Sequence, residues 1–262
     1  MSGVTVTEHR IATPGGSLFA RRWTSDQVSV DAPTIVLFHD SLGSVDLWRS
    51  FPEMLAKRTG MAVVAYDRLG FGQSDPAGAA LTADFIVDEA HVSVPALIEQ
   101  LGLSQLVSFG HSVGGAMAVA TAAMLADRCR AVITESSQAF VEDRTLRGIR
   151  EAAQAFADPD QVARLARYHG DKAAWVLSAW IDTWQAPWFA DWSQDAMLER
   201  LRCPLLAMHG SEDEYGSLAH PRRLVKNAAA GGREVIFDGV GHLPHREQPE
   251  VVLETVAAFL AG

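Results

Sequence analysis

Apolar residues form short continuous runs along the chain, and the longer stretches between them carry apolar residues at helical spacing. Runs without polar alternation are expected for strands that are buried on both faces of a sheet. Strands that alternate with helices in this way indicate an α/β fold, in which a mostly parallel, doubly wound sheet is covered by helices on both sides. The predicted strands are residues 34–39, 62–67, 106–110, 131–134, 204–209 and 233–238.

The remaining patterned stretches predict two helices and a hairpin. Residues 84–102 have apolar side chains at helical spacing and end at Gly102, and residues 251–261 have the same spacing. Residues 3–23 are two alternating stretches joined by Pro14-Gly15-Gly16, which is typical of a β-hairpin. The hairpin adds antiparallel strands at one edge, so we expect a sheet of about eight strands.

Residues 136–202 interrupt this alternation, because they contain helix-forming sequence and no strand candidate. A helical insertion between two strands of a sheet predicts a lid over the strand ends. The chain then divides into a core in two parts, 1–135 and 203–262, and a helical lid, 136–202. Five of the seven tryptophans lie in this lid, at positions 175, 180, 184, 188 and 192.

Charge narrows the range of partners. The formal net charge is -10 at pH 7, so nucleic acids and anionic membrane surfaces would repel the chain. The first residues carry no apolar signal segment, and the longest nearly apolar run, 113–126, is too short to span a bilayer. We therefore expect a cytoplasmic protein with a small-molecule substrate and with no nucleic-acid or membrane partner. The sequence leaves a homodimer open.

No cofactor is indicated. Cys129 and Cys203 are too few for a disulfide framework, and neither a CxxC pair nor a paired-histidine spacing points to a metal site. Residues 67–75 (DRLGFGQSD) approach a dinucleotide-binding motif, but Asp75 stands where that motif needs its last glycine. We expect neither a metal ion nor another cofactor.

Ser112 stands between two glycines in the stretch GHSVG, after a predicted strand and before an alanine-rich helical stretch. The G-x-S-x-G pattern in this setting is typical of a nucleophile elbow. A sharp turn strains the serine backbone and leaves no room for side chains two residues away, which explains the glycines. The free N–H groups at the helix start favour an oxyanion beside the hydroxyl. The alternative is a Gly/Ser turn that only caps the helix.

A serine nucleophile needs a histidine base and an acid that orients the histidine. His242 follows the predicted strand 233–238, and Asp213 follows the predicted strand 204–209, so both share with Ser112 the carboxyl edge of the sheet. The order serine, acid, histidine is the chain order of this architecture. The rivals in the same loops are His245 for the base and Glu212 and Glu214 for the acid.

These motifs together resemble the α/β-hydrolase fold family, over nearly the whole length of the chain. The resemblance rests on GHSVGG around Ser112, YDRLGFGQSD at 66–75, HGSED around the acid and GHLPHREQPE around the base. It implies a serine hydrolase in which Ser112, Asp213 and His242 form a catalytic triad.

The resemblance also implies an oxyanion hole formed by the backbone N–H groups of Val113 and Ser41. Here the sequence departs from the family, because His39-Asp40 replaces the usual His-Gly in the loop that carries Ser41. The run 41–43 (SLG) nevertheless resembles that of enol-lactone hydrolases of this fold.

The bond that is cleaved is less sharply defined. Relatives that cleave carbon–carbon bonds in ring-fission products usually carry Asn before the nucleophile and Trp after the catalytic histidine, whereas His111 and Leu243 stand here. We therefore expect hydrolysis of a carboxylic ester or lactone, with carbon–carbon bond hydrolysis as the alternative. Epoxide hydrolases and dehalogenases of this fold use Asp as nucleophile, which Ser112 argues against. A receptor of the same fold that binds a ligand with little turnover also stays open.

The predicted lid supplies aromatic and aliphatic side chains and no cluster of fixed charge. We therefore expect an uncharged acyl group or lactone of small to medium size. For the lid tryptophans we favour packing onto the core over direct contact with the substrate, and one side chain can do both. The residues expected to bind the substrate are Leu42, His111, Trp180, Trp184, Trp188 and Leu243.

Overall fold

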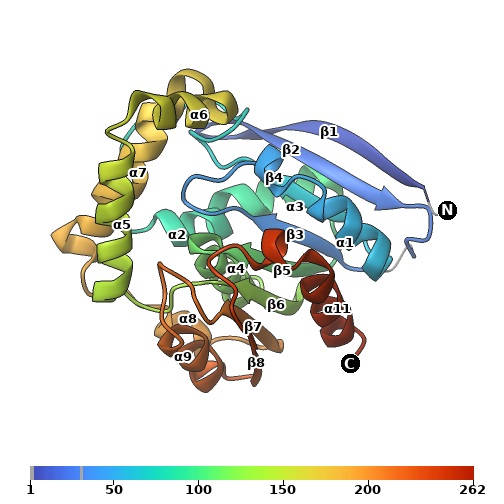
Figure 1. Cartoon of the computed structure of the whole chain (residues 1–262). Helices are drawn as coiled ribbons and strands as arrows, with labels where there is room; N and C mark the ends of the chain where they lie inside the picture. The colour runs from blue at the N-terminus through green and yellow to red at the C-terminus, as the bar shows by residue number, and fades with distance from the viewer. Residues whose placement is uncertain (1–2, 30–31) are drawn as a thin grey trace.

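In the computed structural model, which describes residues 3–29 and 32–262, one eight-stranded sheet lies between two layers of helices (Figure 1). The strand order is β1-β2-β4-β3-β5-β6-β7-β8, and all neighbours from β4 to β8 are parallel. The predicted α/β fold with a mostly parallel, doubly wound sheet is confirmed. The strands are β1 Val4–Thr13, β2 Gly16–Ser25, β3 Thr34–Phe38, β4 Val63–Tyr66, β5 Leu106–His111, β6 Cys129–Glu135, β7 Leu205–Gly210 and β8 Gly232–Phe237.

The predicted N-terminal hairpin forms one edge of the sheet. β1 and β2 pair antiparallel from Val4↔Ser25 to Thr13↔Gly16, with Pro14 at the turn. β2 then pairs antiparallel with β4. The hairpin therefore extends the parallel sheet without adding to the opposite edge, where the proposed acid and base follow their strands.

The helices that cover the sheet are α1 Phe51–Thr59, α3 Val94–Leu101, α4 Val113–Met124, α9 Ala219–Asn227 and α11 Pro249–Leu260. Successive side chains of a strand point to opposite faces. In β3, Ile35 and Leu37 therefore join the apolar cluster with α1 and α11, and Val36 and Phe38 join the cluster with α3, α4 and α9. Burial on both faces explains why the strands are continuous apolar runs in the sequence.

The predicted helix at 84–102 is a continuous helical stretch. It comprises α2 Phe85–Asp88, a π-helical turn at Glu89–Ser93 and α3. Gly102 follows with a φ of +64°, a conformation that glycine adopts without steric cost, and the helix ends there as expected.

Residues between β6 and β7 form several helices (Figure 1). The long helices within residues 143–185 stand away from the sheet, whereas the short helix at residues 195–198 packs beside α4 and α9. α7 ends at Gln185, because Pro187 cannot continue the helix. The elements are α5 Asp143–Ala155, α6 Pro159–His169, a 3₁₀ turn Gly170–Lys172, α7 Ala173–Gln185, a 3₁₀ turn Pro187–Phe189 and α8 Asp195–Leu198.

Two short elements complete the fold, a 3₁₀ turn at Val45–Trp48 and α10 at Pro244–Glu247. Within residues 3–29 and 32–262, no helix is both long and apolar enough to cross a membrane.

Candidate active site

Ser112 lies in a strained turn between β5 and α4. Its φ and ψ are +55° and -127°, a conformation that costs a non-glycine residue free energy. A Cβ on Gly110 would come within 1.9 Å of the carbonyl oxygen of Gly114, and one on Gly114 within 2.2 Å of the carbonyl oxygen of Phe38. Both glycines of the G-x-S-x-G pattern are therefore required by close backbone packing.

Asp213 and His242 are hydrogen-bonded to each other. The Nδ1 atom of His242 lies 2.9 Å from Oδ1 and 2.8 Å from Oδ2 of Asp213, whose side chain is fully buried. The backbone N–H groups of Tyr215 and Gly216 also donate to Asp213. Burial opposes ionisation, but His242, His209 and the N–H of Tyr215 hold the pKa of Asp213 below its ordinary value. The carboxylate thus fixes Nδ1 as the protonated nitrogen of His242.

A second histidine, His209, contacts the Asp213 carboxylate. Nε2 of His209, at the end of β7, donates to the carbonyl oxygen of Gly216 at 3.2 Å and lies 3.3 Å from Oδ2 of Asp213. Burial lowers the pKa of His209. The sequence pattern contains His209 in HGSED but gave no sign of this contact.

The rival residues lie elsewhere. His245 is buried and donates from Nδ1 to Oε2 of Glu135 at 2.6 Å. Glu212 and Glu214 have exposed side chains, and His242 pairs with Asp213. Of the candidates, the structure therefore brings together His242 and Asp213.

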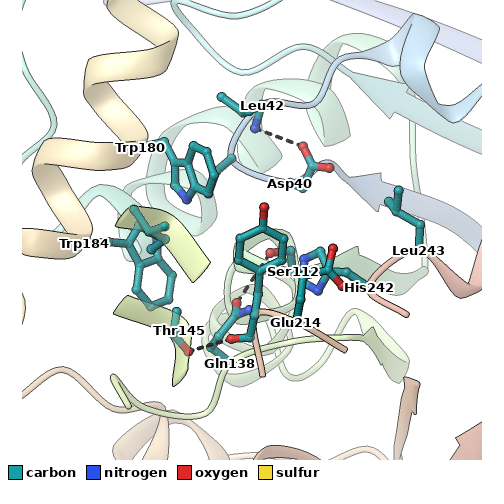
Figure 2. A pocket seen from close by; sticks show the side chains of 13 residues that line it. Asp40, Leu42, Ser112, Gln138, Thr145, Trp180, Trp184, Glu214, His242 and Leu243 are labelled. Carbon is teal, nitrogen blue, oxygen red and sulfur yellow. Dashed lines mark hydrogen bonds between the residues drawn. The ribbon is translucent and has the colours of Figure 1, made fainter. Parts of the chain in front are cut away.

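The hydroxyl of Ser112 faces a cavity of about 240 Å³ that His242 also lines (Figure 2). Ser112 Oγ donates to Oε1 of Gln138 at 3.5 Å. Loops at the strand ends form one side of this cavity, and helices α5 and α7 form the other. The lining residues are Asp40, Ser41, Leu42, Ser112, Gln138, Thr145, Ile149, Trp180, Trp184, Glu214, Tyr215, His242 and Leu243.

Four of the residues expected to bind the substrate line this cavity: Leu42, Trp180, Trp184 and Leu243. Two others do not. Trp188 is 49% exposed and lies beside a separate surface groove. It belongs to the 3₁₀ turn that begins at Pro187, and not to α7, which carries Trp180 and Trp184. The ring of His111 is buried behind the cavity and donates from Nε2 to the carbonyl oxygen of His242 at 2.8 Å. Trp188 and His111 are therefore not among the residues that line the cavity shared by Ser112 and His242.

Six lining residues were not expected from the sequence: Asp40, Gln138, Thr145, Ile149, Glu214 and Tyr215. Thr145 and Ile149 lie one helical turn apart on α5, but spacing alone does not tell which face of that helix meets the cavity. Asp40 and Glu214 give the cavity two carboxylates, and no Lys or Arg is among the lining residues in the part of the chain that the structure describes.

The backbone N–H groups of Ser41 and Val113 are free of intramolecular acceptors within the described residues. Ser41 follows β3 and lines the cavity, and Val113 begins α4 directly after Ser112.

The side chain of Asp40, the residue before Ser41, is held by two contacts. Its Oδ1 accepts the N–H of Leu42 at 3.0 Å, and its Oδ2 lies 3.4 Å from Nδ1 of His111. Burial opposes these shifts, but the pair lowers the pKa of Asp40 and raises that of His111. The half-buried Asp40 carboxylate therefore favours the protonated form of the buried His111 ring.

Three buried side chains come close enough together to hold a metal ion, namely His111, Glu135 and His245. They are already engaged with one another and with the backbone. Glu135 accepts both the backbone N–H and the Nδ1–H of His245, and His111 donates to the carbonyl oxygen of His242. These bonds explain the cluster without an ion.

Comparison with known proteins agrees with this geometry. A family model described as the alpha/beta hydrolase fold matches residues 33–180, more than half of the chain. A proline iminopeptidase of Saccharolobus solfataricus is 23% identical over 241 residues, covering 77% of this chain and 76% of that protein. The human serine hydrolase BPHL is 26% identical over 248 residues, covering 92% of this chain and 82% of that protein.

Among solved structures, the 2-hydroxy-6-oxo-6-phenylhexa-2,4-dienoate hydrolase of Rhodococcus sp. strain RHA1 superimposes with a TM-score of 0.77 at 20% identity. The match covers 99% of this chain and 100% of that one. At this level of identity the likeness shows the fold. Together with the family match, it establishes that the chain belongs to the alpha/beta hydrolase fold family.

Proposed function

We propose that the protein is a serine hydrolase that cleaves a carboxylic ester or lactone through an acyl-enzyme. One observation carries the proposal. A serine in a strained turn at the start of α4 shares a cavity with a histidine whose other side is bonded to a buried carboxylate. This combination supplies a nucleophile, a base and the group that orients the base.

In the proposed reaction, Ser112 Oγ attacks the substrate carbonyl and its proton passes to Nε2 of His242. Because Ser112 now contacts Gln138, the hydroxyl first rotates toward His242; such bonds often tighten only when substrate is bound. Asp213 stabilises the imidazolium that forms. The N–H groups of Ser41 and Val113 hold the developing oxyanion, helped by the dipole of α4. His242 then protonates the leaving group, and water releases the acyl group by the same steps.

The charge of the cavity favours an uncharged ester or lactone over a ring-fission substrate. The Rhodococcus relative is named for a dienoate, which carries a carboxylate. In this protein, Asp40 and Glu214 line the cavity and would repel such a group.

We also propose that residues 136–202 act as a lid, with 1–135 and 203–262 as the two parts of the core. Five cavity residues come from this segment. Glu142, just before α5, accepts the backbone N–H of Ser217 at 2.7 Å and Nε2 of His220 at 2.9 Å. Thr145 donates to the carbonyl oxygen of Tyr215 at 2.6 Å. These bonds tie the proposed lid to the loop that carries Asp213.

The test compares wild type with Ser112→Ala on short and long nitrophenyl esters, lactones and a ring-fission diketone. We expect turnover of the short esters or lactones, labelling of Ser112 by a fluorophosphonate, and loss of both in the variant with the melting temperature unchanged. Faster turnover of the diketone than of every ester would assign carbon–carbon bond hydrolysis instead. Binding without turnover of anything on this panel would favour a receptor.

A further inference from the structure

The carbonyl oxygen of Asp40 accepts three hydrogen bonds. Nδ1 of His39 donates at 2.8 Å, Nη2 of Arg68 at 2.8 Å, and the backbone N–H of Gly43 at 3.2 Å. This oxygen belongs to the same peptide unit as the N–H of Ser41, the proposed oxyanion donor. The three bonds therefore act on the far end of the group that would stabilise the transition state.

Both side-chain donors are fixed in place. Arg68 is 3% exposed, and its guanidinium lies 4.1 Å from the centre of the Phe71 ring. His39 is 2% exposed, and its Nε2 accepts the backbone N–H of Arg68 at 3.2 Å. The ring must therefore carry its proton on Nδ1, facing the Asp40 oxygen. Burial and the charge of Arg68 lower the pKa of His39, which keeps this neutral form.

A planar trans peptide points its C=O and N–H in opposite directions. Holding the Asp40 oxygen on Arg68 and His39 therefore aims the Ser41 N–H away from them. Donors on the oxygen, one of them charged, also polarise the peptide and make its N–H a stronger donor. The Ser41 N–H has no intramolecular acceptor in the described part of the chain, and Ser41 lines the cavity with Ser112.

We propose that Arg68 and His39 are positioning residues that aim and polarise the Asp40–Ser41 peptide as an oxyanion donor. The proposal rests on the function proposed above. It also explains how this loop works with Asp40 where a glycine is usual. The Asp40 side chain is held by the N–H of Leu42 and by His111. Both the carbonyl group and the side chain of Asp40 therefore have fixed partners.

The first test is Arg68→Met, measured on a nitrophenyl ester. Loss of a complete oxyanion donor costs about 100-fold or more in kcat, so misaiming one should cost about 10-fold or more with KM little changed. Inhibition by an alkyl boronic acid, whose adduct with Ser112 places an oxygen in the hole, should weaken by the same factor as kcat/KM falls.

Arg246→Met is the matched control. Arg246 is half-buried, whereas Arg68 is buried, and like Arg68 it donates from Nη2 to a backbone carbonyl. This carbonyl is that of Leu47, which does not belong to the oxyanion loop. We expect it to leave kcat and boronate inhibition near wild type. An Arg68→Met enzyme that keeps both kcat and boronate affinity would overturn the proposal. Equal losses in the two variants would assign Arg68 a structural role only.

His39 supplies a second test that decides the matter if Arg68→Met does not fold. The amide nitrogen of Asn sits close to the position of a histidine Nδ1, so His39→Asn keeps a donor to the Asp40 oxygen and His39→Leu does not. We expect kcat and boronate affinity to be higher in His39→Asn than in His39→Leu by about 5-fold or more. Equal values would contradict the proposal. Failure of the proposed function itself is distinguishable, because wild type would then turn over no ester and Ser112→Ala would change nothing.

Discussion

Two histidine–carboxylate pairs lie in neighbouring parts of this molecule, and only one of them faces the cavity that Ser112 lines. His242 pairs with Asp213 after β7, and His245, three residues later, pairs with Glu135 at the end of β6. The distances are similar, at 2.8 and 2.6 Å. The difference is access. The His242 side chain is 11% exposed and lines the cavity with Ser112, whereas His245 is 3% exposed and packs against the rings of Trp48 and Phe51.

A histidine–carboxylate bond does not by itself mark a candidate base, because His245 has such a bond and does not line the cavity. What matters is whether the free nitrogen of the ring reaches a nucleophile and a substrate. The Glu135 pair instead ties α10 to the end of β6, since Glu135 also accepts the backbone N–H of His245. It therefore supports the loop in which His242 lies.

The largest expected effect is on activity. His242→Ala should lower kcat by about 10,000-fold or more, because triad members act as a unit, and His245→Ala should lower it less than about 10-fold. Initial rates on a nitrophenyl ester, normalised to folded protein, measure both. A larger loss in His245→Ala would reverse the roles assigned to the two pairs.

The pair of Glu135 and His245 is expected to contribute to the free energy of unfolding. Glu135→Ala leaves the imidazole and backbone N–H of His245 buried without their acceptor, which should cost about 3 kcal/mol of unfolding free energy. Glu214→Ala removes an exposed carboxylate and should change it by less than about 0.5 kcal/mol. Urea denaturation followed by tryptophan fluorescence gives both values. A Glu135→Ala protein as stable as Glu214→Ala would show that the second pair contributes nothing to folding.

Lowering the pH into the acid range should destabilise the folded protein, because it protonates Glu135 in the second pair. Burial opposes ionisation, but His245 and His111 hold the pKa of Glu135 below its ordinary 4.5 in the folded state. A lowered carboxyl pKa contributes stability that is complete above the unfolded value, and that stability is lost as pH falls through the folded value. The urea concentration at half-unfolding of wild type should therefore decrease as the pH is lowered below about 4.5. In Glu135→Gln this decrease should be smaller. If the urea midpoints of the two proteins decrease equally with pH, the ionised Glu135 carboxylate does not contribute to stability.

The sequence predicted the sheet because each central strand is buried on both faces, so its residues form an unbroken apolar run. It predicted Ser112 from the two glycines that the tight turn requires. The roles of Ser112, Asp213 and His242 stay predictions until activity is measured. The contacts between segments distant in the chain could not be predicted, such as those of Arg68 with the Asp40 oxygen. They depend on how the loops after β3 and β4 meet, which no local pattern encodes.

The smallest expected effect concerns the tryptophans, where access again separates two similar residues. Trp184 lines the cavity and Trp188 lies outside it, although both belong to the same four-residue spacing in the sequence. Trp184→Ala enlarges the cavity, so kcat/KM across nitrophenyl esters from acetate to octanoate should shift toward longer chains. Because a methylene in an apolar pocket is worth about 1 to 3 kcal/mol, the shift should be graded over the series. Trp188→Ala should leave the profile unchanged. A profile altered by Trp188→Ala and not by Trp184→Ala would place the acyl group in the outer groove and not in the cavity that Ser112 lines.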